Sequence, residues 1–261
     1  MSSPVFVCTS SYGAHYISAH GQSKAVELSA RAGAKGIEIR QELFGPLDTP
    51  LDALATTIKT HGLSCHYSTT ELVWLGDRLN DNLRTSIETA QQLGASLLKV
   101  AIGKLPESPE VQAQTLSRFA QWLEGSALTV AIENDQTPDG GVPDELLKAY
   151  AAFQAAGIKT GLVVDTGNWQ WVGINSSEAA RKLGKKVCYV HCKGVKKEGQ
   201  NLHAAPPSAT ELAQWSSYWS AFPSGIPRAI EFPLADTDTP DNSESTLVSN
   251  TSQWVKRLSH L

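Results

Sequence analysis

The sequence has no excess of positive charge and no long hydrophobic run. Lysine and arginine together number 22, against 26 aspartates and glutamates, which gives a formal net charge of −4. Proteins that bind nucleic acid need a basic face, so this balance argues against a general nucleic-acid partner. No stretch approaches the roughly 18 continuous apolar residues of a membrane span. The first residues, MSSPVFVCTSSYG, lack the basic and apolar regions of a signal peptide, so we expect neither feature.

Cysteine is also scarce. The chain has four cysteines, Cys8, Cys65, Cys188 and Cys192, all in or beside strand-like runs. Only Cys188 and Cys192 are close in sequence, and this pair lacks the second pair that would complete a zinc site. We interpret the cysteines as reduced and packed as small hydrophobic residues. This usage indicates a cytoplasmic protein.

The sequence does have a regular alternation of short apolar runs and longer helical patterns. The runs predict strands at Val5–Thr9, Gly36–Arg40, Leu63–Ser68, Leu97–Ile102, Leu128–Glu133, Gly161–Asp165, Val187–His191 and Arg228–Phe232. The helical patterns that follow them cover Ser23–Ala32, Pro50–His61, Asp77–Leu93, Ser108–Leu123, Pro143–Ala156, Ser177–Leu183, Thr210–Ala221 and Ser245–His260. Such alternation is typical of parallel strands joined by helical crossovers. Eight units in 261 residues favour closure, so we predict an α/β fold with a single (β/α)8 TIM-barrel domain over residues 1–261.

Polar residues stand at the carboxyl ends of the last four predicted strands. In LTVAIEND, Glu133 shares a strand face with Ala131, whereas the bulkier Val130 and Ile132 lie on the opposite face. The bulky face suits packing against helices, so Glu133 is expected to point into the barrel. The corresponding residues of the next three strands are Asp165, His191 and Glu231.

Three carboxylates and one imidazole at one end of a barrel would repel one another without a counter-charge. A divalent cation resolves this repulsion. Oxygen-rich ligands with one nitrogen suit Mn²⁺ best, with Mg²⁺ and Co²⁺ close behind, and Zn²⁺ is a further alternative. The competing interpretation is that each residue is an isolated polar group facing solvent. Four successive strand ends of this kind favour one metal site.

The segments IEND, VVDTGNW, YVHCKG and AIEFP resemble the motifs of the xylose-isomerase-like TIM-barrel superfamily. This group includes sugar-phosphate isomerases and epimerases and the AP endonuclease 2-like family. The resemblance implies one divalent metal ion held by Glu133, Asp165, His191 and Glu231. It also implies that Glu133 and Glu231 act as catalytic acid and base. A homodimer or homotetramer is common among such relatives.

Four further residues are expected to contact substrate. His66 resembles a substrate-contacting histidine of the family, although a structural histidine is an alternative. Lys99 is buried in a strand and needs either substrate or a carboxylate as partner. Asn168 stands where many relatives carry histidine, and Lys193 resembles the lysine of an H-x-K-D motif in which Gly194 replaces the aspartate here.

Two further segments carry charged residues. Glu38 and Arg40 share one face of a strand, and we expect an internal salt bridge there in preference to substrate binding. The segment from 194 to 207, with Lys196, Lys197 and His203, is expected to be a solvated basic loop.

The leading functional hypothesis is a metal-dependent isomerase or epimerase of a small sugar, sugar phosphate or polyol-derived ketone. A metal-dependent dehydratase of an inosose or a 3-dehydroshikimate-like ring is the alternative, and the four motifs do not separate the two. A DNA-repair endonuclease would need extra histidines and a D-x-H motif after His191, which the sequence lacks. A sugar-binding relative without activity is disfavoured by the intact ligand set.

Overall fold

The computed structural model describes residues 2–235 and 243–261. Eight parallel strands close into a barrel in the order β1-β12-β9-β8-β7-β6-β3-β2. The strands are β1 (Val5–Cys8), β2 (Gly36–Arg40), β3 (Ser64–Leu72), β6 (Leu97–Ala101), β7 (Thr129–Glu133), β8 (Thr160–Asp165), β9 (Val187–Cys192) and β12 (Arg228–Ile230). This arrangement confirms the predicted (β/α)8 barrel.

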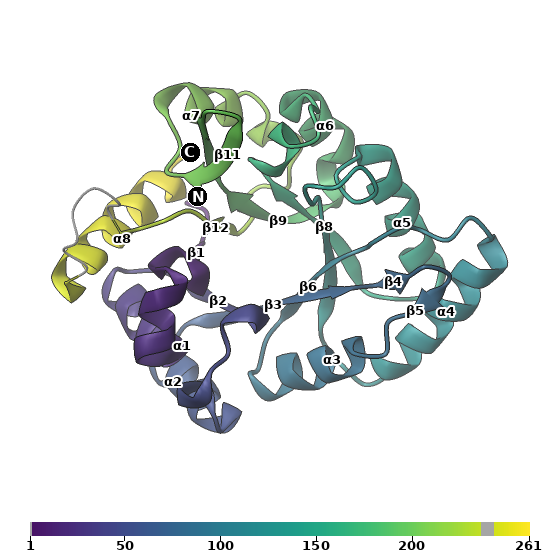
Figure 1. The fold of residues 1–261 in the computed structure, drawn as a ribbon, viewed down its shortest axis with the longest axis horizontal. Helices are drawn as coiled ribbons and strands as arrows, with labels where there is room; N and C mark the ends of the chain where they lie inside the picture. The colour runs from purple at the N-terminus through teal and green to yellow at the C-terminus, as the bar shows by residue number, and fades with distance from the viewer. Residues whose placement is uncertain (1, 236–242) are drawn as a thin grey trace.

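Eight α-helices of the described residues surround the strands (Figure 1). They are α1 (Ala14–Arg31), α2 (Leu51–Thr60), α3 (Leu83–Gln92), α4 (Pro109–Trp122), α5 (Pro143–Ala155), α6 (Ser176–Leu183), α7 (Ala209–Ser216) and α8 (Glu244–Ser259). The last helix, in yellow, lies beside α1, in purple (Figure 1). The Ser3 amide donates to the Ser259 carbonyl at 3.1 Å, so the two ends of the chain meet at the barrel wall.

Two apolar cores lie on the two faces of the barrel wall. Outward-facing residues such as Val130 and Ile132 are fully buried against the helices, as the alternation predicted. Fully burying one such side chain contributes about 1.5–3 kcal/mol. A smaller cluster fills the inside of the barrel, and we call it the apolar layer. Its members are Phe6, Cys8, Leu97, Ala131, Val163, Tyr189 and Ala229.

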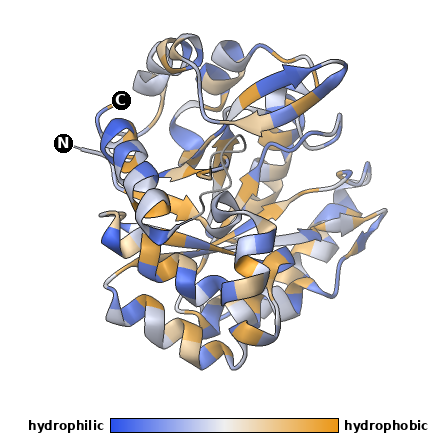
Figure 2. Ribbon diagram, turned by 60° about the vertical axis from the view of Figure 1, so that its left-hand side comes forward, coloured by the Kyte–Doolittle hydropathy of each residue, from blue (hydrophilic) through white to orange (hydrophobic). Residues whose placement is uncertain are grey.

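Gly36 makes room for the Phe6 ring of the apolar layer inside the barrel. A Cβ atom at position 36 would lie 2.1 Å from a ring carbon of Phe6. Real Cβ contacts are never this short, so any side chain at this position would displace the Phe6 ring. In Figure 2 the strands of the barrel are coloured mainly as hydrophobic residues, whereas the helices mix both classes. This contrast fits a barrel buried on both faces inside half-buried helices.

Four local predictions were wrong. Residues from Asp77 to Asn82 are not helical, because β4 (Trp74–Leu75) and β5 (Arg78–Leu79) form a hairpin and α3 begins only at Leu83. The turn passes through Gly76 at φ +62°, a conformation that favours glycine, and it brings Leu79 back beside buried Trp74.

The other three differences are in α1, α7 and the segment after β9. The α1 helix begins at Ala14 rather than Ser23 and contains a non-helical Gly21. The α7 helix ends at Ser216, before a short 3-10 turn. The expected basic loop is a hairpin of β10 (Gly194–Glu198) and β11 (Asn201–Ala205), with most of its side chains exposed. Strand pairing there satisfies backbone groups that a loop would leave to water.

Within residues 2–235 and 243–261, no helix has both the length and the apolar character to cross a membrane.

Candidate metal centre

The four predicted metal ligands meet at the carboxyl ends of β7, β8, β9 and β12. Asp165 and His191 are direct cross-strand partners, and His191 also pairs with Ala229, two residues before Glu231. Because side chains two residues apart share a strand face, the register turns all four into the barrel. One ligand atom from each of Glu133, Asp165, His191 and Glu231 lies within 4.8 Å of the others. All four residues are buried.

Each of the four residues offers one atom that the surrounding chain does not satisfy. Among the described residues, no partner in hydrogen-bonding geometry reaches these atoms, which are Glu133 Oε1, Asp165 Oδ2, His191 Nδ1 and Glu231 Oε2. The His191 Nδ1 atom lies 2.6 Å from Glu133 Oε1 and 2.8 Å from Glu231 Oε2. Buried polar atoms without partners are costly. Three oxygens and one nitrogen that converge in this way fit a divalent cation.

Glu38 orients the only nitrogen ligand. The Nε2 atom of His191 lies 2.7 Å from Glu38 Oε2, and both side chains are fully buried. Donation from Nε2–H to this carboxylate leaves the Nδ1 lone pair for a cation, which is the usual role of a carboxylate behind a histidine ligand. The sequence analysis missed this contact. The one available signal was that Glu38 stands inside an apolar strand.

Protons compete with a cation for His191. Burial alone lowers the pKa of this imidazole, but Glu231, Glu38 and Glu133 together raise the pKa well above its usual value. A cation needs the unprotonated nitrogen, so its binding releases a proton.

Lys99 holds the second oxygen of Glu133. Its ammonium donates to Glu133 Oε2, and both groups are buried. Burial raises the pKa of Glu133, but Lys99 and His191 outweigh this effect and lower the pKa to about 2. Glu133 is therefore ionised at neutral pH. Of the two alternatives for Lys99, the structure shows the carboxylate partner.

Arg40 has the same relation to Glu231. Its Nη1 atom lies 2.9 Å from Glu231 Oε1 and 3.1 Å from Glu38 Oε1. The expected internal salt bridge between Glu38 and Arg40 is therefore present. Each glutamate of the proposed acid and base pair thus has one oxygen held by a cationic side chain and one oxygen beside His191 Nδ1.

Lys193 and Asn168 lie on the far side of the cluster. The Lys193 ammonium lies 2.6 Å from Asp165 Oδ2 and 3.2 Å from Glu231 Oε2. It also donates to Asn168 Oδ1 at 3.3 Å. Burial raises the pKa of Asp165 to about 7, although Lys193 acts in the opposite direction. We use the name charged cluster for Asp165 and Lys193 together with Glu38, Arg40, Lys99, Glu133, His191 and Glu231.

His66 lies deeper in the barrel than the charged cluster. Its ring stacks on Phe6 with centroids 4.1 Å apart and meets Tyr189 edge-on at 4.5 Å. Its side chain is buried, and its Nδ1 has no hydrogen-bond partner in the described part of the chain. Burial lowers the pKa of His66 to about 4, so the ring is neutral at pH 7. These contacts are those of a packed ring, and a role in substrate contact stays a prediction.

Asn134 ties the first two metal-ligand strands together. Its Nδ2 donates to the Asp165 carbonyl at 3.0 Å, and its Oδ1 accepts from the Asp165 amide at 2.6 Å. The Asp165 Oδ1 atom in turn accepts from the amides of Gly167 and Asn168 at 2.8 and 3.0 Å. Asp165 therefore has one fixed oxygen and one oxygen left for a cation.

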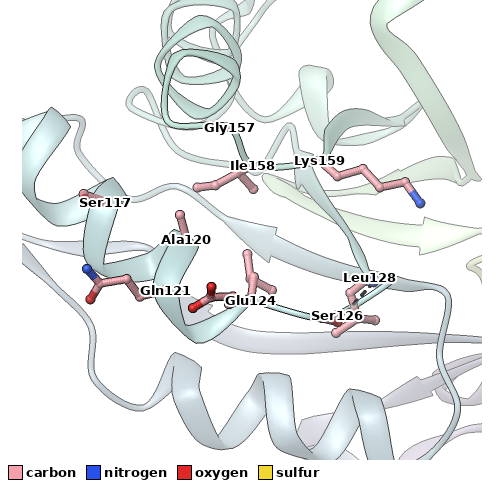
Figure 3. Close-up of a pocket in the computed structure, with 10 residues that line it drawn as sticks. Ser117, Ala120, Gln121, Glu124, Ser126, Leu128, Gly157, Ile158 and Lys159 are labelled. Atoms are coloured by element: carbon pink, nitrogen blue, oxygen red, sulfur yellow. Dashed lines mark hydrogen bonds between the residues drawn. The ribbon is translucent and has the colours of Figure 1, made fainter.

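A separate cleft of about 410 Å³ lies near the end of α4 (Figure 3). It is lined by Leu128 and Gly157–Lys159, which precede β7 and β8. This position is at the opposite ends of the strands from Glu133 and Asp165. The cleft therefore does not belong to the candidate metal centre.

Comparison with known proteins gives the fold and the family. Solved structures similar to this chain include a D-allulose 3-epimerase from Methylomonas sp., with TM-score 0.69, 17% identity and coverage of 99% of this chain and 100% of that one. A structure of IOLI protein with a binding zinc atom has a TM-score of 0.67 and 16% identity, and the match covers 100% of this chain and 99% of that one. The probable 3-DHS dehydratase AsbF from Bacillus anthracis has a TM-score of 0.60 and 13% identity, and the match covers 97% of this chain and 99% of that one.

No curated protein matches the sequence. The family model described as "Xylose isomerase-like TIM barrel" matches residues 26–212, which is more than half of the chain. The chain therefore belongs to the xylose isomerase-like TIM-barrel family.

Proposed function

We propose that the protein is a divalent-metal-dependent isomerase or epimerase of a small sugar, sugar phosphate or polyol-derived ketone. The observation that carries this proposal is the set of four unsatisfied atoms at the strand ends, two of them glutamate oxygens within 2.8 Å of His191 Nδ1. The membership of a family with sugar epimerases supports the assignment to an enzyme.

The metal ion would be held by Glu133, Asp165, His191 and Glu231, and we propose Mn²⁺. Zinc in the IOLI structure makes Zn²⁺ an alternative. When bound, such an ion polarises a substrate carbonyl and so acidifies the neighbouring C–H. His191 offers only Nδ1, because Glu38 occupies Nε2.

Glu133 and Glu231 are the proposed proton carriers. Glu133 is ionised, because Lys99 and His191 hold its pKa near 2, and it removes a proton from the carbon beside the carbonyl. Burial raises the pKa of Glu231, but His191 and Lys193 outweigh this effect and hold the pKa well below its usual value, so Glu231 would take up a proton from solvent before it returns one to the other side or to the neighbouring carbon. Return to the other face inverts a stereocentre, whereas return to the neighbouring carbon moves the carbonyl. Lys99 and Arg40 fix the orientation of both carboxylates.

Dehydration of an acidic ring ketone is the second candidate. The same proton abstraction followed by loss of a hydroxyl gives a lyase, and the similarity to the probable 3-DHS dehydratase supports it. Lys193, a basic side chain beside the proposed metal ligands, also suits an acid as substrate. A cytoplasmic location and a homodimer or homotetramer remain predictions from the sequence.

A substrate screen in D₂O tests the function. The Mn²⁺-loaded protein is incubated with ketoses, ketose phosphates and cyclic polyol ketones, and products are followed by NMR and mass spectrometry. Deuterium incorporation without loss of water indicates an isomerase or epimerase, whereas loss of water indicates the lyase. If no substrate exchanges hydrogen with solvent, and the protein binds no divalent ion, the proposed function is wrong.

A further inference from the structure

Lys193 occupies oxygens that a metal ion would use. Its ammonium lies within 3.2 Å of Asp165 Oδ2 and Glu231 Oε2, which are two of the four unsatisfied atoms. Both contacts are ion pairs between buried or nearly buried side chains. An ammonium and a divalent cation repel each other strongly in a buried site. Lys193 therefore cannot keep both contacts when a divalent ion is bound.

The charges of the cluster favour an anion once the metal ion is present. With His191 neutral, as metal binding requires, four carboxylates face three basic side chains, which leaves one negative charge on Glu38, Arg40, Lys99, Glu133, Asp165, Lys193 and Glu231 together. A divalent ion turns this into one positive charge. Glu42 also contacts Arg40, but its side chain is 35% exposed and water screens its charge.

The other basic residues of the cluster keep their partners. Lys99 binds Glu133 Oε2, and Arg40 binds Glu231 Oε1 and Glu38 Oε1, none of which is an unsatisfied atom. Lys193 is thus the one cation of the charged cluster whose carboxylate contacts compete with a metal ion.

Asn168 is a neighbour of Lys193 that does not carry charge and is held in place by other contacts. Asn168 Oδ1 accepts from Lys193 and from Gln136, and Asn168 Nδ2 donates to the Asn134 carbonyl, so this amide is held in place. The next residue offers no carboxylate, because it is Gly194. A Cβ atom at position 194 would lie 2.5 Å from the Pro207 Cα.

We propose that Lys193 has two roles, neutralising Asp165 and Glu231 without metal and binding an oxyanion of the substrate with metal bound. This inference about Lys193 rests on the proposed function. It makes the substrate an anion that carries a carboxylate or a phosphate, rather than a neutral sugar. Lys193 is then the residue that determines this specificity, and Asn168 positions it.

Metal binding tests the first role without any substrate. Mn²⁺ is titrated into the wild-type chain and into Lys193→Met by calorimetry, with Lys197→Met on the exposed hairpin as the matched control. We expect Lys193→Met to bind Mn²⁺ at least 10-fold more tightly and Lys197→Met to bind as the wild type does. Equal or weaker Mn²⁺ binding by a folded Lys193→Met variant would overturn the proposal.

Anion binding to the Mn²⁺-loaded proteins tests the second role. The probes are glycolate, inorganic phosphate and the neutral dihydroxyacetone, each followed by calorimetry. Lys193→Met is expected to lose at least 10-fold in affinity for glycolate or phosphate but not for dihydroxyacetone, and Lys193→Arg is expected to retain the anion. A loss for glycolate alone indicates a carboxylate on the substrate, and a loss for inorganic phosphate alone indicates a phosphate.

Unchanged affinity of Lys193→Met for both anions would refute the anionic substrate and leave the metal-dependent function standing. A wild-type chain that binds neither Mn²⁺ nor another divalent ion would instead refute the proposed function itself.

Discussion

The charged cluster and the apolar layer occupy the same barrel interior and share strands β6, β7, β8 and β9, yet one consists of charged side chains and the other mainly of apolar ones. On β7, β8 and β9 the two sets stand two residues apart: Ala131 and Glu133, Val163 and Asp165, Tyr189 and His191. Apolar side chains there gain free energy from burial, whereas buried charges lose hydration and need partners. The apolar layer therefore supports stability, whereas the charged cluster is where we propose that the chemistry takes place.

The largest expected effect is on the proposed proton carriers. Glu133→Gln and Glu231→Gln each keep the shape of the side chain but remove a group that exchanges protons, so kcat should fall about 10²–10⁴-fold. Steady-state kinetics on the substrate found in the D₂O screen measures this. Val163→Ala in the apolar layer is the control, with kcat nearly unchanged. Full activity in both glutamine variants would exclude the acid and base roles.

The apolar layer should show the reverse behaviour. Phe6→Ala removes a ring that stacks on His66 and contacts Tyr189, so it should lower the free energy of unfolding by about 3–5 kcal/mol. Urea denaturation of the metal-free protein measures this loss. Glu231→Gln denatured in parallel should lose less. If Phe6→Ala abolished metal binding while stability stayed the same, the division between the two regions would be wrong.

His66, which packs against Phe6 and Tyr189 of the apolar layer, should make stability depend on pH. Its pKa is lowered by burial to about 4 in the fold, against an ordinary value of 6.5, so below pH 6.5 the unfolded chain takes up a proton that the fold refuses. The stabilising contribution is present above pH 6.5 and is lost as the pH falls towards 4, by about 2–3 kcal/mol.

The difference between the wild type and His66→Phe in unfolding free energy, measured from pH 7.5 to 4.5, reports this loss. His61→Phe, at an exposed position, is the control. A pH-independent difference for His66→Phe would show that the ring is not held neutral.

The smallest expected effect is at Glu38, which lies between the two regions. Glu38→Gln keeps a hydrogen-bond partner for His191 but removes the charge that fixes its tautomer, so Mn²⁺ affinity should fall about 10–100-fold. Calorimetric titration of Mn²⁺ measures this, and Glu42→Gln at the exposed edge should leave the affinity unchanged. If Glu38→Gln bound Mn²⁺ as tightly as the wild type, Glu38 would serve only as the ion-pair partner of Arg40 and would not orient His191.

Much of this molecule could be predicted from local patterns. The alternation of strand and helix patterns predicted the barrel. The polar residue at the end of each of the last four strands predicted the set of metal ligands Glu133, Asp165, His191 and Glu231. Both inferences depend on periods of two and about 3.6 residues, which are properties of the chain itself. The same reasoning failed at Asp77–Asn82, because the Gly76 turn and the buried Trp74 favoured a hairpin over helix propensity.

The contacts that define the chemistry were decided only by the tertiary structure. Glu38 reaches His191 from 153 positions away in the sequence, and Arg40 reaches Glu231 from 191 positions away. Barrel closure and strand register determine which inward residues become neighbours, and neither can be read from one strand at a time. The sequence by itself determined which strand ends carry charge. The fold decided which charge neutralises which, because that depends on distances across the barrel.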